Sequence, residues 1–126
     1  MSLSGYKVSA QIAVSDMAQA KEFYEGKLGL SGGEGPNDQT RTYACGAGTS
    51  LHVYASPAHA GKATATLARW DVDDLEHVVD ELGCNGVTFE RFDGPVKTDE
   101  KGIHDSGYGK VAWFKDPDGN TFAVEQ

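Results

Sequence analysis

His52 is the side chain of this 126-residue chain that is best suited to chemistry. An imidazole can transfer a proton near neutral pH, form a hydrogen bond or bind a metal ion. Tyr54 follows two residues later, and Trp113 lies near the end of the chain. The aromatic rings of both residues can stack on a flat or cationic ligand. A structural role stays open for all three: His52 can simply bond to a neighbour, and the two rings can pack in the core.

Two further groups combine polar residue types at informative spacing. Arg69 and Asp71 are two residues apart, so a strand would place both on one face. There they can bind a polar or anionic ligand, or form an ion pair with a structural role. His104 and Tyr108 lie in a glycine-rich segment, 93–109, which is expected to be either a lid over a site or a mobile loop.

These groups sit on a regular pattern of secondary structure. Residues 8–14 alternate between apolar and small polar side chains, which predicts a strand with one apolar face. Ser15 or Asp16 then caps a helix that ends at Gly29. The remaining elements expected in this half are a loop at 31–40, with at most a short irregular strand, and a hairpin formed by 41–45 and 50–54.

The same order of elements then begins again. Thr66–Val72 predicts a strand, and Asp73 or Asp74 caps a second helix. Val87–Phe92 predicts another strand because it carries β-branched and aromatic residues. The chain closes with a predicted hairpin, in which the turn Asp116-Pro-Asp-Gly-Asn120 joins strands at 111–115 and 121–125.

The repeat has a period of about 60 residues, which is too long for a solenoid. Each half reads as strand–helix–strand–strand–strand. We therefore predict an α+β fold, a single domain over residues 1–126 made of two βαβββ modules, at about 6–56 and about 64–126. Each helix is expected to cover one face of its mixed sheet, so that curvature, a partner or a ligand must cover the other.

Composition narrows the classes of function. The hydrophobic content of 39% and charged content of 24% are ordinary for a globular chain. A net charge of −8 disfavours nucleic acid and anionic membranes as partners, and it is compatible with a cationic ligand. Neither a membrane helix nor a secretory signal is recognisable, so the cytoplasm is expected. Cys45 and Cys84 show no zinc or disulfide spacing and are expected to be small buried residues.

The two ends of the chain resemble one family. The opening stretch Val8-Ser-Ala-Gln-Ile-Ala-Val-Ser-Asp-Met-Ala-Gln-Ala-Lys-Glu-Phe-Tyr-Glu-Gly-Lys-Leu-Gly-Leu30 and the closing hairpin around Asp116-Pro-Asp-Gly-Asn120 are similar to those of the glyoxalase / bleomycin-resistance / extradiol dioxygenase superfamily, the vicinal oxygen chelate proteins. The resemblance implies paired modules whose sheets form a cup for a ligand, often with a metal ion. It also implies a homodimer.

The same resemblance implies four strand positions for ligands to Fe, Mn, Ni or Zn. Their occupants here are Ser9, His52, Leu67 and Ala123. Only His52 is a credible ligand, so we expect no metal cofactor. If the register were slipped by two residues, Gln11 and Glu125 would join His52 in a metal site.

We therefore predict a protein that binds a small organic molecule in the cup without a metal, and the acidic chain favours a cationic aromatic compound. An alternative is a divalent-metal-dependent lyase, isomerase or dioxygenase that uses His52, Gln11 and Glu125. A third is a metal-free enzyme in which His52 or Glu125 moves a proton. The residues expected to bind the ligand are Ser9, Gln11, His52, Tyr54, Arg69, Asp71, Tyr108 and Trp113.

Overall fold

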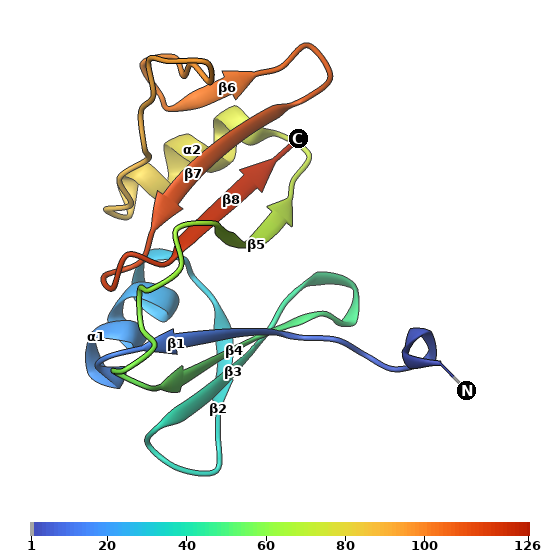
Figure 1. Cartoon of the computed structure of the whole chain (residues 1–126), viewed down its shortest axis with the longest axis vertical. Helices are drawn as coiled ribbons and strands as arrows, with labels where there is room; N and C mark the ends of the chain where they lie inside the picture. Colours follow the sequence, from blue (N-terminus) through green and yellow to red (C-terminus); the bar gives the residue numbers. More distant parts are fainter. Residues whose placement is uncertain (1) are drawn as a thin grey trace. The chain divides into compact units, whose positions relative to one another are not determined.

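The computed structural model describes residues 2–126, which form two compact units that divide between Gly61 and Lys62 (Figure 1). Each unit has its own four-stranded sheet and its own helical segment. We describe the units one at a time and call them unit 1 and unit 2 in chain order.

Unit 1 has the strand order β1-β4-β3-β2, in which β1 and β4 are parallel and the other pairs are antiparallel. Its elements are η1 (Leu3–Gly5), β1 (Ala10–Val14), α1 (Met17–Lys21), η2 (Glu22–Lys27), β2 (Ser31–Glu34), β3 (Thr40–Ala44), η3 (Gly46–Gly48) and β4 (Ser50–Ala55). This is the predicted strand–helix–strand–strand–strand order, with β2 inside the stretch that was expected to be mainly loop.

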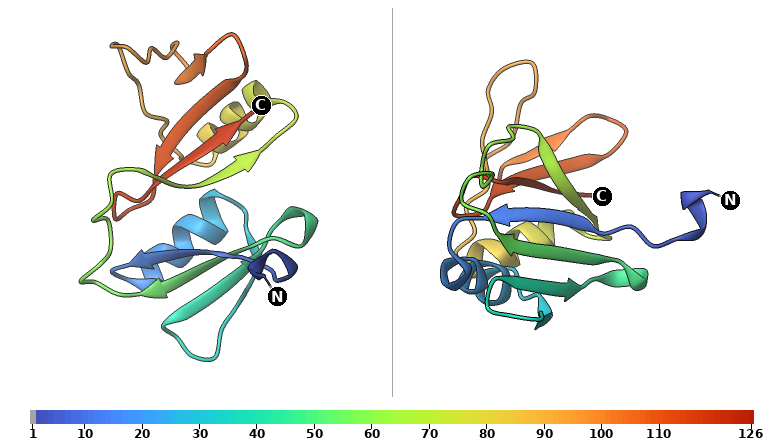
Figure 2. Two further views of the ribbon diagram at one scale, coloured as in Figure 1. Left: turned by 45° about the vertical axis from the view of Figure 1, so that its right-hand side comes forward. Right: turned by 60° about the horizontal axis from the view of Figure 1, so that its bottom comes forward.

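The helical segment of unit 1 begins at a side-chain cap and packs through aromatic residues. The carboxylate of Asp16 accepts hydrogen bonds from the backbone N–H groups of Ala18 and Gln19, which have no partner within the helix. Tyr24 belongs to η2, which is a π-helix. Its ring stacks on the ring of Tyr43 in β3, with the two ring centroids 6.2 Å apart. The helix therefore covers one face of the sheet (Figure 2) and leaves the other face open.

Unit 2 repeats this topology. Its strand order is β5-β8-β7-β6, in which β5 and β8 are parallel. Its elements are β5 (Thr66–Asp71), α2 (Leu75–Cys84), β6 (Ile103–Asp105), β7 (Lys110–Lys115) and β8 (Thr121–Glu125). The α+β fold and the two βαβββ modules predicted from the sequence are therefore confirmed.

An aromatic layer lies on the helix-facing side of the unit 2 sheet. The ring of Phe114 lies 5.6 Å from Phe122 and 6.2 Å from Trp70, so that three adjacent strands contribute to one cluster. Leu75 and Val79 of α2 are buried and lie four residues apart, so they form the apolar stripe of this helix. Because strand side chains alternate, the intervening residues of β7 and β8 point to the opposite, open face.

The predicted strand at 87–92 is wrong. Only Phe89 forms an isolated bridge, to Phe114, and the backbone N–H of Glu90 donates to the carbonyl of Trp113. Residues 110–112 of β7 already pair with β6 along this edge. Only the end of β7 near Phe114 is left for residues 87–92, so one bridge forms there instead of a full strand. The predicted loop at 93–109 correspondingly contains β6, so His104 lies in a strand.

Two smaller expectations also fail. Val8 was expected in the first strand but is exposed, since β1 begins at Ala10. Cys84 is exposed at the end of α2 and Cys45 is half-buried, so neither is the buried small residue that was expected. No helix within residues 2–126 is long and apolar enough to cross a membrane.

Candidate functional site

A cavity of about 710 Å³ opens on the face of the unit 2 sheet that points away from α2. Its size is typical of pockets for small organic molecules. The residues that line it come from the strands β5, β7 and β8, from the chain just before β5 and from the connection between α2 and β6, and they are Thr64, Ala65, Thr66, Glu90, Phe92, Asp93, Gly94, Pro95, Val96, Trp113, Lys115 and Thr121. We call this cavity the pocket.

The floor of the pocket follows from strand register. Trp113 pairs with Ala123 and Lys115 pairs with Thr121 across β7 and β8. Since alternate residues of a strand share a face, Trp113, Lys115 and Thr121 all point away from the aromatic layer of the core. The sheet therefore presents one aromatic ring and two polar side chains to the pocket.

A register shift in β5 adds a third polar group to this floor. Thr66 pairs with Thr121, but the next pair along the strand is Ala68 with Phe122, so Leu67 is the extra residue of a bulge. Without the bulge, the register of Arg69 opposite Ala123 would place Leu67 opposite Thr121. Bulges re-aim side chains in this way next to binding sites. Thr66 lines the pocket, and Leu67 does not.

The opposite wall of the pocket is a closed loop, residues 92–98, which we call the strap. The backbone N–H of Phe92 donates to Thr98 Oγ1 at 2.8 Å, and the N–H of Thr98 donates to the carbonyl of Phe92 at 3.0 Å. Asp93 and Lys97 form an isolated bridge between these contacts and the tip. The strap is thus closed by hydrogen bonds between its own two ends.

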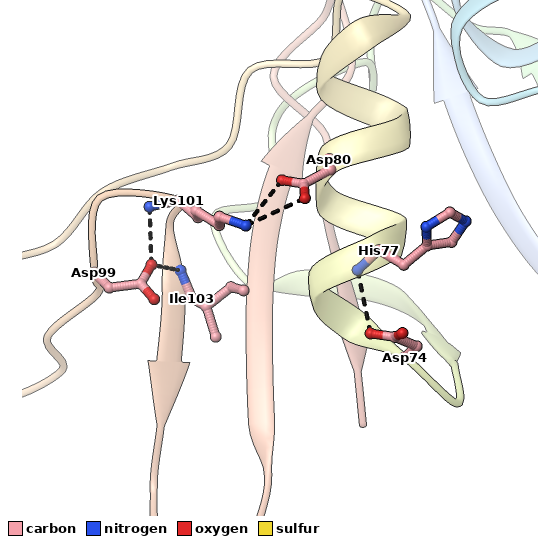
Figure 3. Close-up of polar contacts among 6 residues, drawn as sticks. All are labelled: Asp74, His77, Asp80, Asp99, Lys101 and Ile103. Carbon is pink, nitrogen blue, oxygen red and sulfur yellow. Dashed lines mark hydrogen bonds and ion pairs between the residues drawn. The ribbon is translucent and has the colours of Figure 1, made fainter.

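A tight turn, Asp99–Gly102, anchors the strap to the rest of unit 2 (Figure 3). Asp99 Oδ1 accepts from the N–H groups of Lys101 and Ile103, each at 2.9 Å. The Lys101 ammonium lies 3.2 Å from both carboxylate oxygens of Asp80 on α2, and this hydrogen bond raises the pKa of Lys101. Gly102, at φ +88°, packs against Phe89 and Glu90. The wall of the pocket is therefore tied to both the helix and the sheet.

Aromatic rings join the strap to the floor. Phe92 meets Trp113 edge-on, with ring centroids 5.6 Å apart. On the other side, His104 lies 6.3 Å from Trp113, and its Nδ1 is 2.8 Å from the carbonyl oxygen of Lys97. His104 was expected in a lid or mobile loop. It instead lies on β6, where it contacts both the strap and the pocket tryptophan.

Two groups of charged side chains lie on this face of the sheet, and one of them lines the pocket. Glu90 and Lys115, which both line it, lie 3.7 Å apart, while Asp93 adds a second carboxylate. Further along the same face, Arg69 lies 3.0 Å from Asp71 and 2.8 Å from Glu125. Arg69 and Asp71 thus form an ion pair, with Glu125 as a third member. Each group has one more negative than positive charge.

The predicted residues of unit 1 lie on the open face of its own sheet. His52 pairs with Gln11 across β1 and β4, and its Nδ1 lies 2.9 Å from Thr42 Oγ1. Its ring stacks on Tyr54 with centroids 6.2 Å apart. The amide of Gln11 donates to Ser9 Oγ at 3.1 Å. The contact with Thr42 therefore holds the imidazole through Nδ1.

The structure therefore places the eight predicted ligand-binding residues in different surroundings. Four of them, Ser9, Gln11, His52 and Tyr54, belong to unit 1, while Arg69, Asp71, Tyr108 and Trp113 belong to unit 2. Among them, Trp113 alone lines the pocket, and Tyr108 is fully exposed at the tip of the β6–β7 hairpin. Sequence reasoning missed Phe92, Glu90 and the strap, although Asp-Gly-Pro after an aromatic residue is a recognisable turn signal.

The residues present do not fit the metal site that the sequence resemblance implied. Leu67 has no donor atom, and Ala123 offers only a methyl group that is 3% exposed. Ser9 already accepts a hydrogen bond from Gln11, and Glu125 is held by the guanidinium of Arg69. Within the described part of the chain, no three His, Cys, Asp or Glu side chains gather as a metal-binding group.

Comparison with known protein families agrees with the resemblance seen in the sequence. The family model described as the Glyoxalase/Bleomycin resistance protein/Dioxygenase superfamily matches residues 8–124. No curated protein matches the chain.

Solved structures match over nearly the whole chain. A glyoxalase / bleomycin resistance protein from Catenulispora acidiphila DSM 44928 is 23% identical, with a TM-score of 0.70, and the match covers 94% of this chain and 96% of that one. A bleomycin resistance determinant encoded on the transposon Tn5 is 22% identical, with a TM-score of 0.68 and coverage of 96% and 97%. TnmS3, an antibiotic binding protein from Streptomyces sp. CB03234, is 25% identical, with a TM-score of 0.64 and coverage of 96% of both chains.

Proposed function

Because the chain belongs to the glyoxalase/bleomycin resistance protein/dioxygenase superfamily, we propose that it binds a small organic molecule with a flat aromatic ring, and that it does so without a divalent metal. The observation that carries the proposal is the pocket of about 710 Å³ between Trp113 and the strap. The antibiotic binding protein and the bleomycin resistance determinant among the similar structures support a role in small-molecule binding.

The pocket suits such a ligand for physical reasons. Phe92 and Trp113 offer aromatic surface, and Pro95 and Val96 add apolar surface from the strap. Burial of an apolar ring against these groups removes its surface from water, which is the main favourable term in binding. The excess of carboxylate over ammonium at the rim favours a cationic or neutral ring over an anionic one.

Isothermal titration calorimetry with three probes of similar shape tests this proposal. We expect 1-methylquinolinium and naphthalene to bind more tightly than naphthalene-2-sulfonate. In the variant Trp113→Leu, binding should weaken by at least about tenfold, because truncation of a central aromatic contact commonly costs 2 kcal/mol or more. Tyr54→Leu in unit 1 is the matched control, which should leave binding unchanged. Equal binding to wild type and Trp113→Leu would contradict the proposal.

The metal-free part of the proposal has a separate test. Protein purified without chelator and without a histidine tag should contain much less than one Fe, Mn, Ni or Zn ion per chain, and EDTA should not change probe binding. A stoichiometric metal that is lost in His52→Ala would instead favour the metal-dependent enzyme. The homodimer stays a prediction, which the mass in solution tests.

A further inference from the structure

Two threonine hydroxyls on the pocket floor suggest which ring compounds it selects. Thr66 and Thr121 are register partners on β5 and β8, and both line the pocket. No hydrogen bond within residues 2–126 engages either hydroxyl, whereas the hydroxyl of Thr98 is used to close the strap. These two groups are therefore available to a ligand.

The sheet places the two threonine residues side by side. Neighbouring strands lie about 4.8 Å apart, and the bulge at Leu67 brings Thr66 into line with Thr121. Lys115 is the next residue in the same row, because it pairs with Thr121 on the other side, but its ammonium is held near Glu90. The row gives the floor a polar edge, in which the two threonine hydroxyls can both donate and accept hydrogen bonds and the Lys115 ammonium can only donate.

The strap wall has the opposite character. Pro95 has no backbone N–H, and the N–H of Gly94 already donates to the carbonyl of Val96. Phe92 and Val96 add apolar surface next to the ring of Trp113. A ligand in the pocket thus meets apolar side chains and the Asp93 carboxylate on the strap side, and hydroxyl groups along the β5–β8 side.

We propose that the pocket selects aromatic rings that carry two oxygen substituents on one edge, spaced like neighbouring strands, and that Thr66 and Thr121 are the residues that recognise them. The oxygens of a meta-dihydroxy ring have this spacing, so each can lie directly opposite one threonine, whereas the oxygens of an ortho-dihydroxy ring are closer together and cannot both align with the two strands. This inference rests on the proposed function, because it assumes that the ring lies against Trp113.

Binding of three neutral probes, measured by calorimetry, tests the inference: naphthalene, 1,3-dihydroxynaphthalene and 2,3-dihydroxynaphthalene. We expect the 1,3-isomer to bind most tightly. In Thr121→Val and in Thr66→Val, its affinity should fall about three- to tenfold, which corresponds to one hydrogen bond. Naphthalene should bind equally well to wild type and both variants, because valine keeps the shape of threonine. Thr42→Val in unit 1 is the matched control and should change none of the three affinities.

The outcomes separate the two proposals. If naphthalene binds and Trp113→Leu weakens it, but the two dihydroxy isomers bind alike or both valine variants leave the preference intact, the selectivity is refuted and the proposed function stands. If none of the probes binds to wild type, both proposals fall. Circular dichroism of each valine variant verifies that β5 and β8 still form, so that a loss of affinity reports on the hydroxyl.

Discussion

Units 1 and 2 have the same strand order but differ in the chain that joins the helix to the next strand. In unit 1, η2 ends at Lys27 and β2 begins at Ser31. In unit 2, α2 ends at Cys84 and β6 begins only at Ile103. The longer connection in unit 2 holds the strap and its anchoring turn, and the strap supplies one wall of the pocket.

The comparison shows that the repeated sheet can supply the floor of a site in either unit. The length of the chain between the helix and the next strand determines whether a wall forms over that floor. Both sheets turn an open face of mixed polar and aromatic side chains away from their helices. In unit 1 that face carries His52 and Tyr54, while in unit 2 the strap closes over Trp113. Binding sites are often built by loops on a rigid scaffold, because a loop can change without cost to the core.

The largest effect is expected at the turn that anchors the strap. In Gly102→Ala, the new Cβ would lie 2.9 Å from both the carbonyl oxygen of Glu90 and Cβ of Phe89, at a φ of +88°. Overpacking and backbone strain together should lower the free energy of unfolding by about 2–4 kcal/mol and weaken binding of 1-methylquinolinium. Urea denaturation and calorimetry measure the two effects.

A matched glycine separates strain from packing in this experiment. Gly107 also has a positive φ, +86°, but no heavy atom lies within 4 Å of the position of an added Cβ. Gly107→Ala should therefore cost only about 1–2 kcal/mol from backbone strain and should leave the pocket intact. Similar losses of binding in both variants would mean that packing of the turn against residues 89–90 does not position the strap.

An intermediate effect, confined to unit 1, is expected from Tyr43. Its hydroxyl donates to a carboxylate oxygen of Glu25 at 2.8 Å, and the ring is fully buried. Tyr43→Phe should lower the free energy of unfolding by about 1–2 kcal/mol, since hydrogen bonds to charged groups are worth more than neutral ones. Probe binding in unit 2 should not change. A large change in probe affinity would show that the two units are energetically coupled.

The same residue gives unit 1 a dependence on alkaline pH. Burial and, after it, the hydrogen bond and charge of Glu25 raise the pKa of Tyr43 above its usual range. The unfolded chain therefore loses the tyrosine proton at lower pH, near 10, than the folded chain does. The stabilisation is complete below that pH and declines as the pH rises above it. Urea midpoints between pH 8 and 11 should show this decline in wild type and less of it in Tyr43→Phe.

The sequence predicted the repeat well because its signals are local. Asp16 and Asp74 cap helices, and Asp116 accepts hydrogen bonds from Asp118 and Asn120 within the closing turn. Each of these contacts joins residues that are close in the chain, so residue type and spacing are sufficient to predict them. Family membership and the α+β fold followed from the same stretches.

The pocket could not be predicted in the same way, because it depends on register. Whether Thr66 or Leu67 faces Thr121 is decided by pairing between β5 and β8, which are far apart in the chain. A register shift of one residue moves each side chain of a strand to the opposite face of the sheet, and no residue type within 64–72 indicates the bulge. Phe92 was likewise expected in a strand, although it closes the strap over Trp113.

The smallest expected effect concerns the link between α2 and the strap. Lys101→Met removes the ion pair with Asp80 but keeps most of the aliphatic side chain. Because exposed ion pairs contribute little to stability, amide hydrogen exchange of Thr98 and Ile103 should speed up by no more than about fivefold. Glu81→Gln, which removes the contact of Glu81 with His77 on the same helix, should leave these two amides unchanged. If Lys101→Met also leaves them unchanged, the strap is held by Asp99 and Gly102 alone, and the helix of unit 2 covers its sheet, as in unit 1, without acting on the site.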